Sequence, residues 1–367
     1  MIELTRSELR HFDGPRCPEM QPLTGAIRAC LDTMNENFGF IDNGGWRLDR
    51  GTALICCLSG EAFAGDAAEL CDRNTLANSM SGIRTLMDAL GYAFDIRSTD
   101  PNRADSLSRE AMRARIVEQL GVKKLPFVTD GFWDPPMGYA VTGFDEEADE
   151  LVGWNYPVFD FSSDPAPAEA RRANWYESAA FFLFFGARTR IPSETSLIRR
   201  GVLEAARYAA GANADFYETL LQFLAQSEDE CIRAAIRTHT IIGDHNPPAS
   251  LFADAERVRA ELVRVADPLW CSVSERRYYA GHFFRMAKSA LPAHADALDK
   301  IAGSYDRQSA LFGKDYLRDV GHDPVDREQF RDPAVRARMA DVVRAAQAEE
   351  RMAAALLSEL TAHLDRA

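Results

Sequence analysis

The stretch "DGFWDPPMGYAVTGFDEEADELVGWNYP" (residues 130–157) predicts a β-hairpin, and this hairpin decides the class of fold. Residues 139–144 are apolar and prone to form a strand, and residues 151–154 are apolar again. The acidic residues 145–150 between them are too highly charged to be buried, so they are expected to form the turn. A chain with such a hairpin contains an antiparallel sheet.

The residues before the hairpin mix helical and extended patterns. Apolar residues recur with helical spacing in three segments, and Gly91 is placed to end the second of these helices. Residues 92–97 alternate between apolar and charged side chains, as a half-buried strand does. The elements expected in this part are helices at 22–39, 81–91 and 107–120 and strands at 92–97 and 125–129.

The residues after the hairpin change character near Ser193. Residues 160–172 have the composition of a loop or linker, and the phenylalanine-rich residues 178–189 favour a central strand, with a helix as the alternative. From Ser193 onward the strands stop. Amphipathic helices are expected at 194–211, 213–227, 229–243, 252–266, 268–290, 293–316 and 332–365.

These patterns predict an α+β protein with two domains. Residues 1–190 are expected to form an α/β domain with an antiparallel sheet, and residues 191–367 an all-α helical domain. With 367 residues, the chain is long enough for both.

The composition excludes several classes of partner. The net charge of −14 argues against nucleic acid and against an anionic membrane surface, because both require a basic face. No apolar run approaches the ~20 residues that span a bilayer, and the N-terminus lacks the apolar core of a secretory signal. The seven cysteines form no C-x-x-C pair, so we expect reduced thiols in a cytoplasmic protein.

Two motifs carry a resemblance to a known family. The order of elements, the segment CLSGEAF (57–63) and the triplet Gly143–Phe144–Asp145 resemble the N-terminal domain family of butirosin biosynthesis protein H. More remotely, they are similar to the papain-like peptidase domains that process bacteriocin leader peptides. The resemblance covers residues 15–190 and implies a papain-like fold. The helical remainder is similar to the extension that many such proteins carry.

The resemblance also implies where the catalytic residues of such an enzyme lie. A nucleophilic cysteine stands at a helix N-terminus, a histidine takes its proton, and an Asp or Asn orients the imidazole. In this chain Pro22 falls at the nucleophile position and Met137 at or beside the histidine position. Asn155 is the candidate for the orienting residue. Only the third member of the triad is therefore kept.

A count of histidines supports the same interpretation without any alignment. The chain has seven histidines, and none of them lies between residues 12 and 238. The α/β domain, apart from His11, therefore holds no imidazole that could pair with a thiol. Cys17 is the best remaining candidate nucleophile, although an ordinary loop thiol is the simpler interpretation. Cys30, Cys56 and Cys57 are expected to pack in the core.

Other polar groups predict no metal and no cofactor. The acidic run 145–150 is a solvated turn rather than a calcium loop, because it lacks the glycine and the longer ligand series. His282 is expected to pack among aromatic residues, and Asp244 with His245 to lie in a loop. Glu349 and Glu350 have no matching Glu-x-x-His elsewhere in the chain.

These observations leave three hypotheses of function. The first is a non-catalytic papain-like protein that binds a peptide or an acylated small molecule in a bacterial secondary-metabolite or peptide pathway. The second is an acyltransferase or amide hydrolase that uses Cys17 and a histidine from outside the α/β domain. The third is an interaction protein that forms a homodimer through its helical domain. For the first, the cleft is expected to be lined by Trp133, Tyr139, Trp154 and Tyr156.

Overall fold

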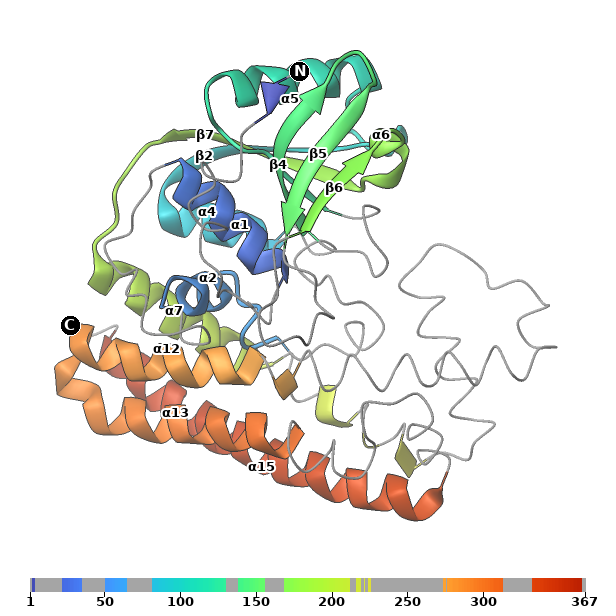
Figure 1. Cartoon of the computed structure of the whole chain (residues 1–367). Helices are drawn as coiled ribbons and strands as arrows, with labels where there is room; N and C mark the ends of the chain where they lie inside the picture. The colour runs from blue at the N-terminus through green and yellow to red at the C-terminus, as the bar shows by residue number, and fades with distance from the viewer. Residues whose placement is uncertain are drawn as a thin grey trace. The chain divides into compact units, whose positions relative to one another are not determined.

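A computed structural model describes the greater part of the chain (Figure 1). The described residues are 2–3, 22–34, 50–64, 81–129, 138–155, 168–211, 216–218, 221, 224–225, 273–274, 276–312 and 332–364. The chain forms two compact units, of which the first comprises residues 1–59 and 76–193. The second comprises residues 60–75 and 194–367, so a short N-terminal segment belongs to the helical unit.

The first unit is built on an antiparallel sheet with the strand order β2-β7-β3-β4-β5-β6, and β1 pairs with β4. The predicted hairpin is confirmed, because β4 and β5 pair with Ala140 opposite Trp154. A bulge between Val141 and Gly143 shifts the register within this pair. The strands are β1 (Ile2–Glu3), β2 (Tyr92–Ser98), β3 (Phe127–Thr129), β4 (Gly138–Asp145), β5 (Glu150–Asn155), β6 (Ala168–Arg172) and β7 (Phe181–Arg188).

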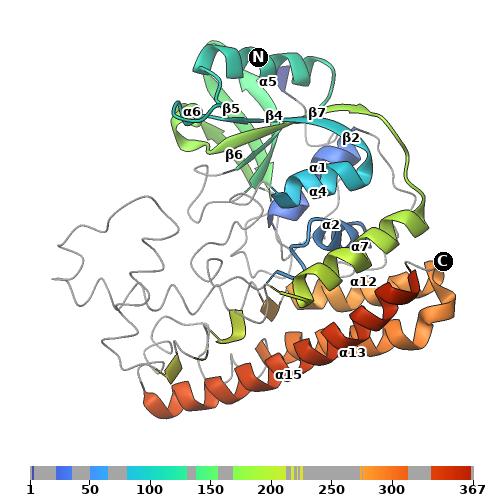
Figure 2. The same ribbon diagram turned by 180° about the vertical axis from the view of Figure 1, so that it is seen from behind.

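Helices cover both faces of this sheet. α1 and α4 lie on one face and α5 lies on the other, as two opposite views show (Figures 1 and 2). On the first face, the guanidinium carbon of Arg84 in α4 lies 5.8 Å from the ring centroid of Phe94 in β2. The helices of this unit are α1 (Pro22–Thr33), α2 (Arg50–Leu58), α4 (Ser81–Leu90), α5 (Arg109–Gly121) and α6 (Trp175–Ser178).

Arginines attach α5 to the second face. The guanidinium carbons of Arg109 and Arg113 lie 5.3 Å and 5.4 Å from the ring centroids of Trp175 and Phe144. Such cation–π contacts join a polar helix to an aromatic face. Arg109 also forms an ion pair of 2.6 Å with Asp149 in the hairpin turn. These contacts add to the buried Met112, Ile116 and Leu120 of α5, so arginine contacts and apolar packing together fix the helix.

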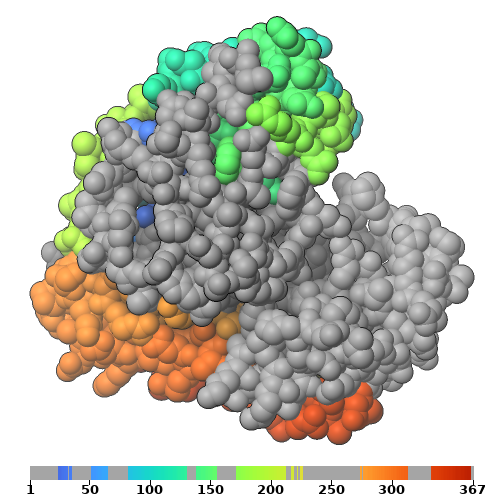
Figure 3. All heavy atoms as spheres, viewed as in Figure 1, coloured from blue at the N-terminus to red at the C-terminus, as the bar shows by residue number. Residues whose placement is uncertain are grey.

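All the described regular elements of the second unit are helices. α12 packs against α13 and α7, and α15 packs against α13 and α7. In the space-filling view α12 and α13 form a continuous orange surface (Figure 3). No described helix combines the length and the apolar character needed to cross a bilayer. The elements are α7 (Glu194–Ala209), α12 (Arg276–Ala290), the 3-10 helix η5 (Pro292–His294), α13 (Ala295–Ala310) and α15 (Pro333–Leu364).

Charged and polar side chains lie inside the core of the second unit. The Arg277 guanidinium is fully buried and donates from Nε to the Gln308 side chain at 3.0 Å. It also donates from Nη1 to the Ala62 carbonyl at 2.8 Å and lies 3.7 Å from the Glu350 carboxylate. The Tyr217 hydroxyl donates to the same Gln308 oxygen at 3.0 Å. We call Arg277, Gln308, Glu350 and Tyr217 the buried arginine cluster.

Most of the elements expected from the sequence are confirmed. The α+β class, the helical C-terminal region, the strand at 181–188 and the helices α1, α4, α5, α7, α13 and α15 are present. The expected loop at 160–172 is wrong in part, because residues 168–172 form the edge strand β6. The helices α2 and α6 were not expected. The helices expected at 229–243 and 252–266 lie outside the described residues.

Candidate functional site

The site expected from the resemblance falls where β3 and β5 end and β4 begins. Thr129, the last residue of β3, pairs with Gly138, the first residue of β4. Ala140 pairs with Trp154, so the end of β5 at Asn155 lies at the same end of the sheet. α1 contacts all three of these strands. The described part of the first unit therefore brings a helix together with the strand ends where the resemblance expects a cleft.

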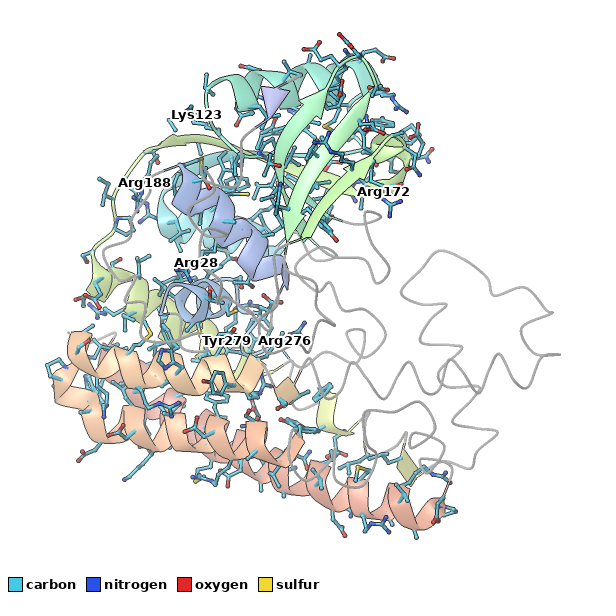
Figure 4. The ribbon with its side chains drawn as sticks, viewed as in Figure 1. Arg28, Lys123, Arg172, Arg188, Arg276 and Tyr279 are labelled. Carbon is cyan, nitrogen blue, oxygen red and sulfur yellow. The ribbon has the colours of Figure 1, made fainter. Side chains whose placement is uncertain are left out.

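Buried polar contacts fix α1 to its neighbour α2. The Arg28 Nη1 group donates to the Thr52 hydroxyl at 3.2 Å, and Figure 4 labels Arg28 between the two helices. The Cys56 thiol donates to the Thr24 hydroxyl at 3.4 Å. These contacts hold the two helices in a defined relation, because buried polar groups must be paired.

Strand alternation places Tyr139 on the face of the sheet that α5 covers. Tyr139 pairs with Val128, which pairs with Phe182, so the three side chains share one face. The ring centroid of Phe182 lies 6.1 Å from that of Trp175, the residue on which Arg109 of α5 stacks. Tyr139 is only 2 % exposed, and burial raises the pKa of its phenol although Arg172 opposes the shift. Tyr139 is therefore a core residue.

Trp154 points to the opposite face, which corrects the expectation that Tyr139 and Trp154 line one cleft. Trp154 pairs with Ala140, the neighbour of Tyr139, and a residue's neighbours along a strand face the other way. A Cβ atom added at Gly153 would lie 3.3 Å from the Cβ of Tyr139, which confirms that residues 139 and 153 share a face. Trp154, which is partly exposed, belongs to the face of α1 and α4.

On the face of α1 and α4, the start of β4 offers no group for proton transfer. Gly138 and Ala140 are the residues of β4 on this face near the strand end, and neither has a functional side chain. Thr129 lies beside Gly138. Its hydroxyl is fully buried and has no hydrogen-bond partner in the described part of the chain. This orphaned hydroxyl is an unpaired polar group at the strand end.

The described thiols are core groups, as the sequence predicted. Cys30, Cys56 and Cys57 are fully buried, and the Cys30 thiol lies 3.8 Å from the Pro126 carbonyl. Burial raises the pKa of Cys30 and of Cys57 well above the ordinary value for a thiol. Both remain protonated at neutral pH and are poor nucleophiles.

The described imidazoles belong to the second unit. They are His282 on α12, His294 in η5 and His363 on α15. The sequence of the first unit holds a single histidine, His11, which lies outside the described residues. Within the described residues, no three His, Cys, Asp or Glu side chains come together to hold a metal ion.

The remaining candidates are placed only in part. α1 begins at Pro22, and β5 ends at Asn155, which pairs with Ala168. The other four candidates, Cys17, Trp133, Met137 and Tyr156, lie outside the described residues.

Glu349 and Glu350 have structural partners. Glu349 accepts hydrogen bonds from Arg307 at 2.7 Å and from Ser304. Both bonds lower the pKa of the Glu349 carboxyl, and the bond from Arg307 has the larger effect. Glu350 belongs to the buried arginine cluster. Both residues are therefore ion-pair partners on the packed face of α15.

Sequence reasoning missed Thr129. A threonine at the end of a short strand is ordinary in sequence, and only the register shows that it lies beside Gly138 on the face of α1. The sequence signal that could have identified Thr129 is its place at the end of the strand "LPFVT", directly before the aromatic hairpin.

Comparisons with known proteins give no family for this chain. No protein-family model matches it, and neither a curated protein nor a solved structure matches it significantly.

Proposed function

We propose that the first unit is a non-catalytic papain-like domain that binds a peptide or an acylated small molecule where β3 and β5 end and β4 begins. The observation that carries this proposal is that the described residues of β4 on the α1 face, near the start of the strand, have no side chain for proton transfer. The resemblance expects the base at or beside Met137, and of the described residues that follow it Gly138 has no side chain and Tyr139 faces away from α1. Thiol–imidazole catalysis requires both groups in one cleft.

The groups that remain suit binding. Trp154 contributes a partly exposed indole, and Thr129 contributes a buried hydroxyl without a partner. Binding sites for small molecules combine apolar walls with a few polar groups that fix orientation. A chain with an amide or ester carbonyl offers the acceptor that the Thr129 hydroxyl lacks.

Replacing Thr129 with valine tests this proposal without removing a stabilising interaction. Because the hydroxyl has no partner, T129V is expected to leave the free energy of unfolding unchanged or slightly raised. The same substitution is expected to weaken binding by about 5- to 10-fold, since one neutral hydrogen bond contributes about 1 kcal/mol. The probes are octanoyl-N-acetylcysteamine and a degenerate heptapeptide library, with affinity measured by tryptophan fluorescence and the recovered probe examined by mass spectrometry.

Thr33 provides the matched control. Its hydroxyl is also buried without a partner, but it lies at the last residue of α1. T33V is expected to bind the probes as the unchanged protein does. Equal affinity in T129V and T33V would show that Thr129 is not part of the site. The proposed function would be refuted if neither probe class bound, or if the protein hydrolysed the thioester.

A further inference from the structure

Two histidines from distant parts of the chain meet at one end of the helical unit. His294 ends η5, the turn between α12 and α13, and His363 lies in the last turn of α15. Their ring centroids are 6.1 Å apart, with an angle of 36° between the ring planes. In Figures 1 and 2 the C-terminal end of α15 lies at the same end of the unit as the α12–α13 turn.

Both imidazoles are available to a ligand. His363 is exposed and His294 is partly exposed, so water and ions reach both rings. Neither ring has a hydrogen-bond or ion-pair partner anywhere in the described residues. By contrast, His282 on α12 has polar or aromatic contacts within the protein. The ring nitrogens of His294 and His363 are therefore not committed to the fold.

We propose that His294 and His363 together bind one divalent transition-metal ion. A metal–nitrogen bond is about 2.0–2.1 Å long, so two imidazoles on a shared ion have ring centroids roughly 5–6.4 Å apart. The observed separation of 6.1 Å lies near the upper end of that range, where the two nitrogens are on nearly opposite sides of the ion. His363 lies at a helix C-terminus, where the backbone carbonyls favour a positive charge.

The number of protein ligands sets the kind of metal. No third His, Cys, Asp or Glu among the described residues joins the pair, so water completes the coordination shell. Arg199 donates to the Leu364 carbonyl, which is therefore already occupied. Two neutral imidazoles with water favour Cu²⁺, Ni²⁺ and Zn²⁺ over Mg²⁺ and Ca²⁺, which prefer oxygen ligands.

Metal binding would join three helices. The ion bridges the α12–α13 turn and the end of α15, which are 69 residues apart in sequence by the numbers of the two histidines. A ligand that binds only the folded state stabilises it by mass action. This inference is independent of the function proposed for the first unit.

A calorimetric titration with NiCl₂ on the tag-free chain tests the site. We expect one Ni²⁺ to bind per chain. Each of H294N and H363N is expected to bind Ni²⁺ at least about 10-fold more weakly, because even the loss of a group that only supports a metal ligand weakens binding about 10-fold. H322N, which removes a histidine outside the pair, is expected to bind as the unchanged chain does. Treatment of accessible thiols with iodoacetamide should leave the titration unaltered, and excess MgCl₂ should not displace Ni²⁺.

A second readout separates the site from scattered surface binding. Ni²⁺ is expected to raise the melting temperature of the unchanged chain and of H322N but not of the H294N/H363N double variant. Circular dichroism of each variant without metal checks that the helices are intact. Absence of stoichiometric Ni²⁺ binding, or equal binding by the double variant, would overturn the proposal.

Discussion

Replacing Arg277 with methionine is expected to lower the free energy of unfolding of the helical unit by about 3–5 kcal/mol, the usual cost of removing one partner from a buried ion pair. The substitution leaves the Glu350 carboxylate and the Ala62 carbonyl buried without their cation. Burial by itself would lower the pKa of the Arg277 guanidinium, but the Glu350 carboxylate raises it, so the group stays charged. Urea unfolding followed by circular dichroism measures the effect.

Arg307 provides the matched control. It also pairs with a glutamate of α15, at 2.7 Å from Glu349, but its side chain is 52 % exposed. Exposed ion pairs contribute about 0–1 kcal/mol, so R307M is expected to change stability little. The double variant R277M/E350L should recover part of the loss, because it leaves no unpaired charge. A loss below 1 kcal/mol in R277M would show that the buried arginine cluster does not hold residues 60–64 to the helices.

The second large effect is expected from Trp175→Ala in the first unit. The Trp175 side chain is fully buried, and its ring makes edge contacts with Phe144 at 5.6 Å and Phe182 at 6.1 Å between centroids. It also carries the stacked guanidinium of Arg109, which attaches α5 to the sheet. Removing a large aromatic side chain from a core costs about 3–5 kcal/mol. Urea unfolding and near-ultraviolet circular dichroism report this loss.

Trp175→Phe separates packing from hydrogen bonding. The indole N–H of Trp175 is buried and has no partner in the described residues. Phenylalanine keeps an aromatic ring beneath Arg109 and gives up no hydrogen bond, so W175F should lose less than half as much stability as W175A. If the two variants were equally unstable, the account of α5 attachment through the aromatic ring would be wrong.

The local elements were predictable because their patterns are local. The alternation of apolar and charged residues in 92–97 predicted β2. The helical spacing of apolar residues in 81–91 predicted α4. Gly91 was expected to end that helix, and its φ of +79° is the conformation that glycine adopts most readily. The acidic turn 145–150 separated the two strands of the hairpin because charges resist burial.

The elements that were missed lack such patterns. β6 has the sequence AEARR, and its charges are typical of an edge strand, so composition alone suggested a loop. α2 has the sequence RGTALICCL, in which every residue from Gly51 to Leu58 is buried, so no polar stripe marks a helix.

The candidate site depends on register, which the sequence shows only weakly. One residue of slip moves every side chain of a strand to the other face. The pairing of Ala140 with Trp154 decides that Tyr139 faces α5 and that Gly138 faces α1. The buried arginine cluster is likewise formed by residues far apart in sequence, such as Arg277 and Ala62. Neither arrangement has a local signature.

The central proposal is that no thiol of this chain is activated by an imidazole. The most direct test is the rate at which iodoacetamide alkylates each of the seven cysteines of the native protein at pH 6.5, resolved by mass spectrometry. A thiol with an ordinary pKa is about 1 % thiolate at this pH, and a thiol whose pKa is raised by burial has a smaller thiolate fraction. We expect every cysteine to react no faster than glutathione, with Cys30 and Cys57 the slowest. A cysteine, Cys17 above all, that reacts about 100-fold faster and slows when a histidine is replaced would contradict the account.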